Sequence, residues 1–304
     1  MILSKHRYPS KILLAVDGSE HTLAAVNLLA DLPLSDNCSI TAYAVIPTQQ
    51  ATRYSAIEIV LEKIKKTFQN KGIAVTMELK AGNPAESINS HADEISPDLI
   101  VLGAKGLRAT LGILLGGVAQ QVVEYARWPV MVVRAPYEGS ERVLLVIDGS
   151  EHSQRAEDYL GQFSLPSGVD VRVMHVLPPE PMPDLVTRSW PVGAEMVMPV
   201  PSPEMEDAAK QQAESEQREG EELLAQSEKN LRAAGMEVDT VLARGDAATE
   251  IINYIKGNKI DLVVVGSRGL SQVGGWLLGS VSRKLVHYAG CSVMIVKGMP
   301  EGAD

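Results

Sequence analysis

Short apolar runs alternate with amphipathic stretches along the whole chain. Each apolar run is four to eight residues long. Such near-continuous apolar strands, separated by helical stretches, are typical of a parallel sheet covered on both faces. The pattern therefore predicts an α/β fold with doubly wound sheets. The expected strands are 11–16, 39–46, 73–80, 98–103 and 130–134, then 142–147, 170–177, 236–243, 261–266 and 293–297.

The chain also repeats itself. "KILLAVDGSEH" (11–21) recurs as "RVLLVIDGSEH" (142–152), and residues 99–133 recur as residues 262–296 with sixteen of 35 positions identical. A repeat of this length indicates a tandem duplication of one folding unit. We therefore expect two α/β domains, residues 1–138 and 139–304, joined near residues 135–141.

The second copy carries an insert of about 32 residues, near 178–210, that contains eight prolines. Because proline breaks helices and central strands, we expect a long surface loop there. The alternative is a lid or a partner-docking arm that uses Trp190, Met196 and Met198. The acidic stretch that follows, 206–234, predicts one long amphipathic helix.

Composition narrows the classes of function. The 304 residues carry a net charge of −10, so a general electrostatic grip on nucleic acid is not expected. The two cysteines, Cys38 and Cys291, suggest neither a disulfide framework nor a zinc site and fit a reducing compartment. The sequence has neither a signal-peptide pattern nor a run of 18 apolar residues, and we expect a cytoplasmic protein without membrane insertion.

A glycine pattern follows the fourth strand of the second half. Gly266, Gly269 and Gly279-Ser280 form G-x2-G-x9-G-S, which matches neither the phosphate loop nor the dinucleotide fingerprint. Ligands of open α/β sheets bind beyond the carboxyl ends of the strands, where this loop and Asp148 both emerge. Phosphate binding is one interpretation of the pattern. A purely structural loop between strand and helix is the other.

The phosphate interpretation gives each residue a task. Gly266 and Gly269 lack Cβ atoms, so their backbone can approach a ligand closely or take positive φ. The helix that begins at Gly279-Ser280 offers amide groups and a positive dipole end, and the Ser280 hydroxyl can donate to a phosphate oxygen. Asp148 suits ribose hydroxyls or a hydrated metal ion bound to the phosphates.

These residues resemble the motif of the universal stress protein family in its tandem form. The resemblance rests on G-x2-G-x9-G-[ST] after an apolar fourth strand, on Asp-Gly-Ser after the first strand, and on the duplication. It implies five strands per domain in the order 3-2-1-4-5, and pseudo-dimer packing of the two domains through their fifth strands. It also implies ATP binding in many members and cytoplasmic roles in stress tolerance, and it leaves room for a homodimer and an unidentified protein partner.

Carried over position by position, the resemblance implies two unequal nucleotide sites. In the second half Asp148 and the backbone around Val176 would hold ribose and adenine, and the glycine segment the phosphates. Gly117 stands in the first half where the serine or threonine of the motif belongs, so ATP binding there is in doubt. The expected binding residues are Asp148, Val176, Gly266, Arg268, Gly269, Gly279, Ser280 and Val281, with Asp17, Val45, Gly103, Gly106, Gly116 and Gly117 as their first-half counterparts.

Catalysis has little support in the sequence. Asp17, Ser19 and His21 could suggest a hydrolase triad, but residues within one strand-to-helix turn do not converge easily, and Ser19 and Ser150 are better explained as helix N-caps. Fast phosphoryl transfer needs a base and more cationic charge than Arg268 supplies. We therefore favour a regulatory protein that binds ATP with Mg²⁺ and has no catalytic residues. The alternatives are a slow ATPase or other nucleotide-dependent enzyme, and a ligand-free stress scaffold.

Overall fold

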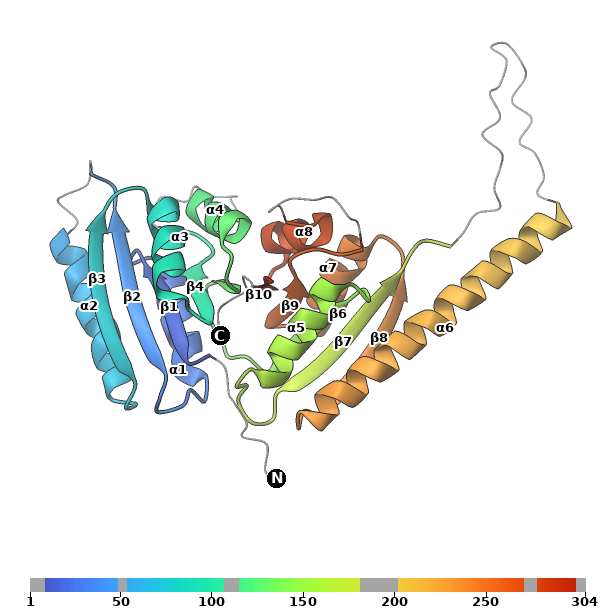
Figure 1. Cartoon of the computed structure of the whole chain (residues 1–304), viewed down its shortest axis with the longest axis horizontal. Helices are drawn as coiled ribbons and strands as arrows, with labels where there is room; N and C mark the ends of the chain where they lie inside the picture. The colour runs from blue at the N-terminus through green and yellow to red at the C-terminus, as the bar shows by residue number, and fades with distance from the viewer. Residues whose placement is uncertain (1–8, 49–53, 107–114, 181–201, 271–277, 299–304) are drawn as a thin grey trace, which may run out of the picture.

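Strands and helices alternate through both halves of the chain (Figure 1). The computed structural model describes residues 9–48, 54–106, 115–180, 202–270 and 278–298. The first half contains β1 (Lys11–Val16), α1 (Glu20–Asp31), β2 (Ser39–Ile46), α2 (Tyr54–Gln69), β3 (Ala74–Ala81), α3 (Pro84–Ile95), β4 (Leu99–Gly103), α4 (Gly117–Tyr125) and β5 (Val130–Val133). The second contains β6 (Arg142–Ile147), α5 (Glu151–Gln162), β7 (Asp170–Leu177), α6 (Pro203–Ala233), β8 (Val238–Arg244), α7 (Ala247–Asn258), β9 (Leu262–Gly266), α8 (Ser280–Tyr288) and β10 (Ser292–Val296).

All ten strands belong to one sheet, in the order β3-β2-β1-β4-β5-β10-β9-β6-β7-β8. Within each half every neighbouring pair is parallel. The halves meet where β5 pairs antiparallel with β10, with Met131 opposite Met294. The prediction of an α/β fold with a mostly parallel sheet is confirmed.

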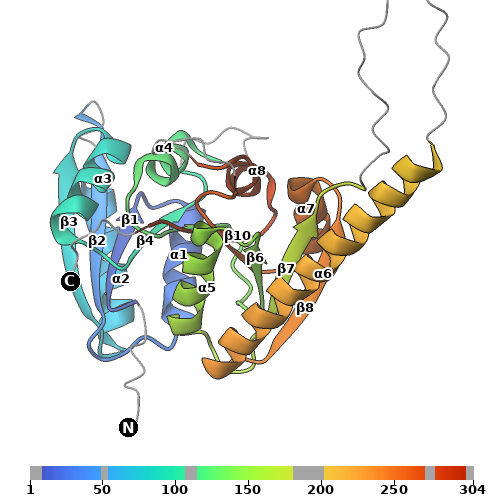
Figure 2. The same ribbon diagram turned by 45° about the vertical axis from the view of Figure 1, so that its right-hand side comes forward.

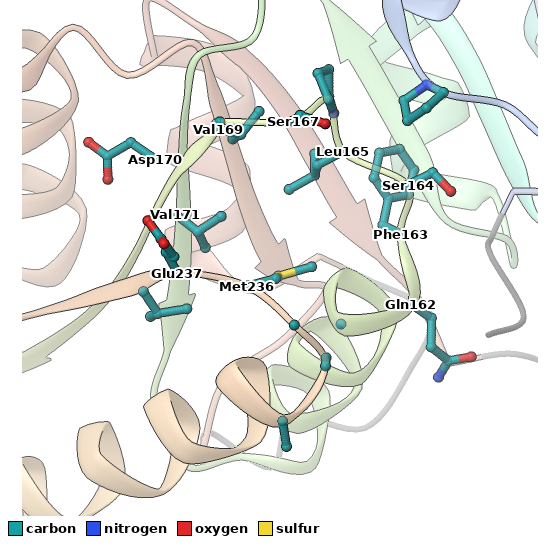
Figure 3. A pocket seen from close by; sticks show the side chains of 18 of the residues that line it. Gln162, Phe163, Ser164, Leu165, Ser167, Val169, Asp170, Val171, Met236 and Glu237 are labelled. Atoms are coloured by element: carbon teal, nitrogen blue, oxygen red, sulfur yellow. The ribbon is translucent and has the colours of Figure 1, made fainter. Parts of the chain in front are cut away.

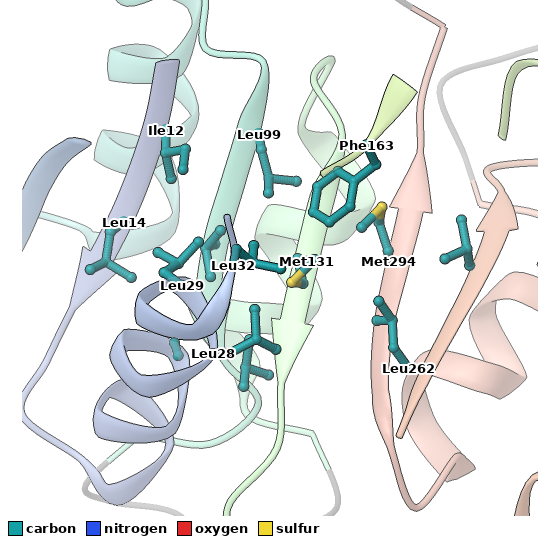
Figure 4. Close-up of a cluster of buried hydrophobic side chains, with 14 of the residues drawn as sticks. Ile12, Leu14, Leu28, Leu29, Leu32, Leu99, Met131, Phe163, Leu262 and Met294 are labelled. Carbon is teal, nitrogen blue, oxygen red and sulfur yellow. The ribbon is translucent and has the colours of Figure 1, made fainter. Parts of the chain in front are cut away.

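Helices cover both faces of this sheet. One hydrophobic cluster joins the sheet to α1, α2, α5 and α6, and a second cluster joins the other face to α3, α4, α7 and α8. The first cluster runs across the junction, where Leu28 of α1, Leu32 directly after α1 and Phe163 lie around Met131 and Met294 (Figure 4). The two halves therefore share one core.

Polar contacts reinforce the same junction. The Arg134 guanidinium, just after β5, donates to the carbonyl oxygens of Val286 at 2.7 Å and Cys291 at 3.0 Å in the other half. The Tyr159 hydroxyl of α5 donates to the Asp98 carbonyl at 3.0 Å. Because buried carbonyl groups cost free energy without a donor, these bonds hold the two halves together.

The long helix begins earlier than its sequence pattern predicts. It starts at Pro203, because Ser202 caps it with a bond from the Met205 amide at 3.3 Å and proline suits a first helical position. The insert therefore ends near residue 202 rather than 210, and residues 181–201, with Trp190, Met196 and Met198, lie outside the described residues. Figure 2 shows α6 running along β7 and β8 and projecting beyond the sheet.

The turns after β1 and β6 carry the expected helix caps. The Ser19 hydroxyl accepts from the Thr22 amide at 3.2 Å, and the Ser150 hydroxyl accepts from the Ser153 amide at 3.2 Å. The interpretation of both serines as N-caps is confirmed. Each cap fixes the chain direction directly after an aspartate, and so positions Asp17 and Asp148 at the carboxyl edge of the sheet.

Candidate functional site

The carboxyl ends of β6, β7 and β9 meet at a cavity of about 200 Å³ in the second half. Parallel pairing brings these ends together, with Ile147 opposite His175 and Val146 opposite Val265. All eight binding residues expected in this half line the cavity: Asp148, Val176, Gly266, Arg268, Gly269, Gly279, Ser280 and Val281. Among the described residues of the lining, Asp148 is the one carboxylate and Arg268 the one cation.

Gly266 is needed for packing rather than for a positive φ. A Cβ atom there would lie 2.5 Å from the His152 carbonyl oxygen and 2.9 Å from the Ser153 nitrogen, at the start of α5. Among the described glycines with positive φ, neither Gly266 nor Gly269 appears. The close approach that excludes a side chain at Gly266 is therefore an approach of the loop to α5, a reason that the sequence did not reveal.

Gly269 lies directly against the Asp148 carboxylate. A Cβ atom on Gly269 would come within 2.4 Å of Asp148 Oδ2. The other carboxylate oxygen, Oδ1, accepts a hydrogen bond from the Ser150 amide at 3.0 Å. Asp148 is thus held by the turn it begins, with Oδ2 on the side of the glycine loop.

The start of α8 closes the other side of the cavity. The Gly279 amide donates to the Ser267 carbonyl at 2.8 Å, which ties the helix start to the loop but uses the amide of Gly279 itself. No side chain caps the helix, and the Ser280 side chain is exposed. Because the first amides of a helix lack intrahelical acceptors and lie at its positive end, an anion is favoured there.

Two hydroxyl groups and two α7 residues complete the cavity and were not singled out in the sequence. Ser282 donates to the Gly266 carbonyl at 2.8 Å and Ser153 to the Ser150 carbonyl at 2.9 Å, so both hydroxyl hydrogens are used internally. Ala247 and Ile251 of α7 form an apolar wall. The repeated helix start "RGDAATEI" (244–251) was the signal that could have identified this wall.

The first half builds the same turn with one further bond. Asp17 Oδ1 accepts from the Ser19 amide at 2.9 Å and also from the Thr22 hydroxyl at 2.7 Å, whereas the counterpart of Thr22 is Ser153, which bonds elsewhere. Asp17 therefore has less hydrogen-bonding capacity left than Asp148. The sequence does not reveal this difference, because threonine and serine look equivalent there.

The glycines of the first half repeat the packing of the second. A Cβ atom on Gly103 would lie 2.6 Å from His21 Cβ, and one on Gly106 would lie 2.7 Å from Asp17 Oδ2. The Gly116 amide donates to the Ala104 carbonyl at 2.8 Å, and α4 begins at Gly117 without a side-chain cap. Val45 at the end of β2 lies opposite Lys80 of β3, while its counterpart Val176 lies opposite Ala243.

Charge is distributed unevenly around the second-half cavity. Burial lowers the pKa of His152, and the charges of Arg155 and Arg268 lower it further. Its Nδ1 lies 3.3 Å from the Ser267 hydroxyl oxygen. Burial, followed by the charge of Arg268, also lowers the pKa of Lys297 to about 8. Arg268 thus places positive charge beside both groups, while the carboxylates of Glu151 and Asp148 act in the opposite direction on His152.

A larger cavity of about 1260 Å³ lies at the amino ends of β7 and β8, away from the strand ends that form the first cavity (Figure 3). Its walls are residues 161–171 and 233–239, with Pro33 from the first half. Within the part of the chain that the structure describes, its lining includes Asp170, Glu237 and Asp239 but no lysine, arginine or histidine, so it is poorly suited to phosphate. None of the residues expected in the nucleotide site lies there.

No group of three or more His, Cys, Asp or Glu side chains in the described part of the chain is placed to hold a metal ion. Over the same residues, no helix combines the length and the apolar character needed to cross a membrane.

Comparison with known proteins gives consistent matches. The model of the universal stress protein family matches residues 9–134 and again 139–297. Universal stress protein YxiE of Bacillus subtilis is 30% identical over 156 residues, which cover 51% of this chain and 98% of that protein. A universal stress protein of Mycolicibacterium smegmatis is 26% identical over 321 residues, covering 94% of this chain and 96% of its own. In fold, the chain is similar to the crystal structure of a universal stress protein from Archaeoglobus fulgidus, with a TM-score of 0.63, 18% identity, and coverage of 96% and 97%.

Proposed function

Because the chain belongs to the universal stress protein family, with two copies of the family domain, we propose that it is a regulatory protein that binds ATP. We place one domain over residues 1–138 and the other over 139–304, and assign the better nucleotide site to the second. The two free cysteines, both buried, fit a cytoplasmic location, where thiols stay reduced.

One observation carries this proposal. Residues of β7, β9 and α8 and of the turns after β6 and β9, chosen from the sequence pattern and the family resemblance, line a single cavity. That cavity combines an uncapped helix start, a hydroxyl at Ser280, a cation at Arg268 and a carboxylate at Asp148. Phosphates fit the first three groups, since helix amides, hydroxyls and guanidinium groups all donate to phosphate oxygens.

The remaining residues suit the nucleoside. Asp148 faces the loop with Oδ2, where it would accept from ribose hydroxyls or from the waters of a Mg²⁺ ion bound to the phosphates. Val176, Ala247 and Ile251 offer the apolar surface that a base needs. Among the described lining residues Arg268 is the one cation and Asp148 the one group that could act as a general base, so the site suits binding better than rapid phosphoryl transfer.

The two halves should differ in affinity for ATP. The first half has Gly117 at the position of Ser280, and its Asp17 carboxylate already accepts from Thr22. A hydrogen bond to a charged group contributes about 1.5–3 kcal/mol, so loss of the serine bond alone corresponds to about 10- to 150-fold in affinity. Lys105 and Arg268 carry the same charge and should leave this ranking unchanged.

Calorimetric titration with ATP and Mg²⁺ tests the proposal. Ser280→Ala should weaken binding at the stronger site by about 10- to 150-fold, since it removes one donor to phosphate. Gly117→Ser is the matched variant, and should strengthen the weaker site. ATP binding with an affinity that Ser280→Ala leaves unchanged would refute the assigned phosphate site, and no ATP binding at all would refute the function.

A regulatory protein of this kind also needs a way to pass the effect of ATP binding on to other molecules, which we call its output. We propose that the output is a protein contact, formed either between two copies of the chain or with an unidentified protein. Tyr125 and Tyr288, at equivalent ends of α4 and α8, are 61% and 59% exposed and offer apolar surface for such a contact.

A further inference from the structure

Lys297 lies beside the loop that carries Arg268. Parallel pairing sets Val296 opposite Gly266, and the Ser267 amide donates to the Val296 carbonyl at 2.9 Å. Lys297 and Arg268 therefore directly follow Val296 and Ser267, the two residues that this hydrogen bond joins. The lysine follows the end of β10, at the same edge of the sheet as the candidate nucleotide site.

The Lys297 ammonium group is buried without a carboxylate partner among the described residues. The residue is 7% exposed, and its Nζ donates to the Glu124 carbonyl oxygen of α4 at 3.4 Å. The Glu124 carboxylate instead lies 3.6 Å from the Arg283 guanidinium. One weak bond to a carbonyl group compensates poorly for removing an ammonium ion from water.

Arg134 occupies the corresponding position in the first half, and the two residues reach across the junction in opposite directions. Arg134 donates to carbonyl groups at the end of α8, as Lys297 donates at the end of α4. An arginine would serve such a structural role at any physiological pH. The second half instead carries a lysine, which can lose its proton.

We propose that Lys297 is a positioning residue of the second-half nucleotide site, whose charge favours a polyanionic ligand and whose protonation is coupled to binding of that ligand. This inference rests on the proposed function. The ligand class is one with two or more phosphate charges, because these would lie at the loop that carries Arg268, and Lys297 lies beside that loop.

The charged groups around Lys297 determine whether ligand binding takes up or releases a proton. Burial and the charge of Arg268 lower the pKa of Lys297 to about 8. The other charged groups nearby are Glu124 with Arg283, and Arg155 beside Gly298. Phosphate at the loop offsets the charge of Arg268 and raises the pKa of Lys297 again. Binding therefore takes up a proton above pH about 8, and affinity falls as the pH rises through that range.

The expected size can be worked out from linkage. If phosphate raises the pKa of Lys297 by about one unit from about 8, the affinity at pH 9 is about fivefold lower than at pH 7. Burial raises the pKa of the Cys291 thiol to about 12, above this range, and comparison with Lys297→Arg separates the proton uptake of Lys297 from that of His152.

The experiment measures ATP binding by calorimetry at pH 7 and pH 9, and at pH 8.5 in two buffers of different ionisation enthalpy. The wild-type chain should lose about fivefold in affinity and take up a fraction of a proton. Lys297→Arg keeps the charge, so it should bind at pH 9 as it does at pH 7. Lys297→Met should bind more weakly at pH 7 and lose the pH dependence.

The outcomes separate this inference from the function on which it rests. ATP binding by the wild-type chain that takes up no more protons than Lys297→Arg overturns the inference and leaves the function intact. A chain that binds no ATP overturns the function. Because the proton uptake of the wild-type chain is measured directly, the test holds even where Lys297→Met fails to fold.

Discussion

Alanine substitutions at Gly266 and Gly269 should affect different properties, although the two glycines lie close together in sequence. The first should lower the stability of the chain, and the second its affinity for ATP. At Gly266 the new Cβ atom would lie 2.5 Å from the carbonyl oxygen of His152 and 2.6 Å from the carbonyl carbon of the same residue. These are backbone atoms in the first turn of α5, so the helix and the loop must move apart. Overpacking of this kind costs about 1–3 kcal/mol. We expect Gly266→Ala to lower the free energy of unfolding by about that amount.

At Gly269 the obstacle is a side chain. The Cβ atom would lie 2.4 Å from Asp148 Oδ2, and the Asp148 Cγ atom is 3.6 Å away. The carboxylate can rotate, although rotation weakens its bond from the Ser150 amide, which is worth about 0.5–1.5 kcal/mol. Gly269→Ala should therefore remain nearly as stable as the wild-type chain. Since Asp148 is displaced from the cavity, ATP affinity should fall at least about tenfold.

Urea unfolding and calorimetric titration with ATP measure both effects. Gly103→Ala is the matched control, because its Cβ atom would lie 2.6 Å from His21 Cβ and 2.9 Å from the His21 carbonyl carbon. It should lower stability as Gly266→Ala does, but leave the second-half site unchanged.

Two results would refute this reasoning. A folded Gly269→Ala variant with wild-type ATP affinity would show that Asp148 does not contact the nucleotide. A Gly266→Ala variant as stable as the wild-type chain would show that the approach of the loop to α5 tolerates a side chain.

Two other predictions concern the junction and the oligomeric state. Arg134→Met should lower the free energy of unfolding by about 2–3 kcal/mol, because it leaves the Val286 and Cys291 carbonyl groups without their charged donor; an unchanged urea midpoint would contradict this. If Tyr125 and Tyr288 form a contact between two chains, a concentration series in sedimentation velocity should show a dimer that Tyr288→Ser weakens. A wild-type chain that stays monomeric at every concentration, with and without ATP, would rule out the homodimer.

Much of the fold could be predicted because it rests on local patterns. The apolar strands and the helices between them are patterns of neighbouring residues, and the duplication is visible as repeated sequence. Together they indicated the α/β class. Ser19 and Ser150 were recognised as caps for the same reason, since a cap bonds an amide three residues away. The sequence pattern predicts the start of α6 at residue 206, three residues too late. Pro203 resembles the proline-rich segment before it, although it is the first residue of the helix.

The candidate site could be predicted as a set of residues, but its internal bonds could not. The sequence indicated which strand ends and which glycines would come together, because the ends of parallel strands meet at one edge. It did not indicate that Thr22 donates to Asp17 while Ser153 turns to its own helix. That choice depends on the side-chain rotamer of each residue, which the residue type does not determine.

Long-range placement was decided by tertiary structure alone. Gly266 excludes a side chain because of His152, and Lys297 is deprived of water by α4 of the other half, more than a hundred residues away in each case. By itself, the sequence determined the repeating unit, its strands and helices, and the glycine loop after the fourth strand of each half, since these follow from local spacing and from repetition of the sequence. Which groups are buried, and which charges influence one another across the junction, followed only from how the two halves pack.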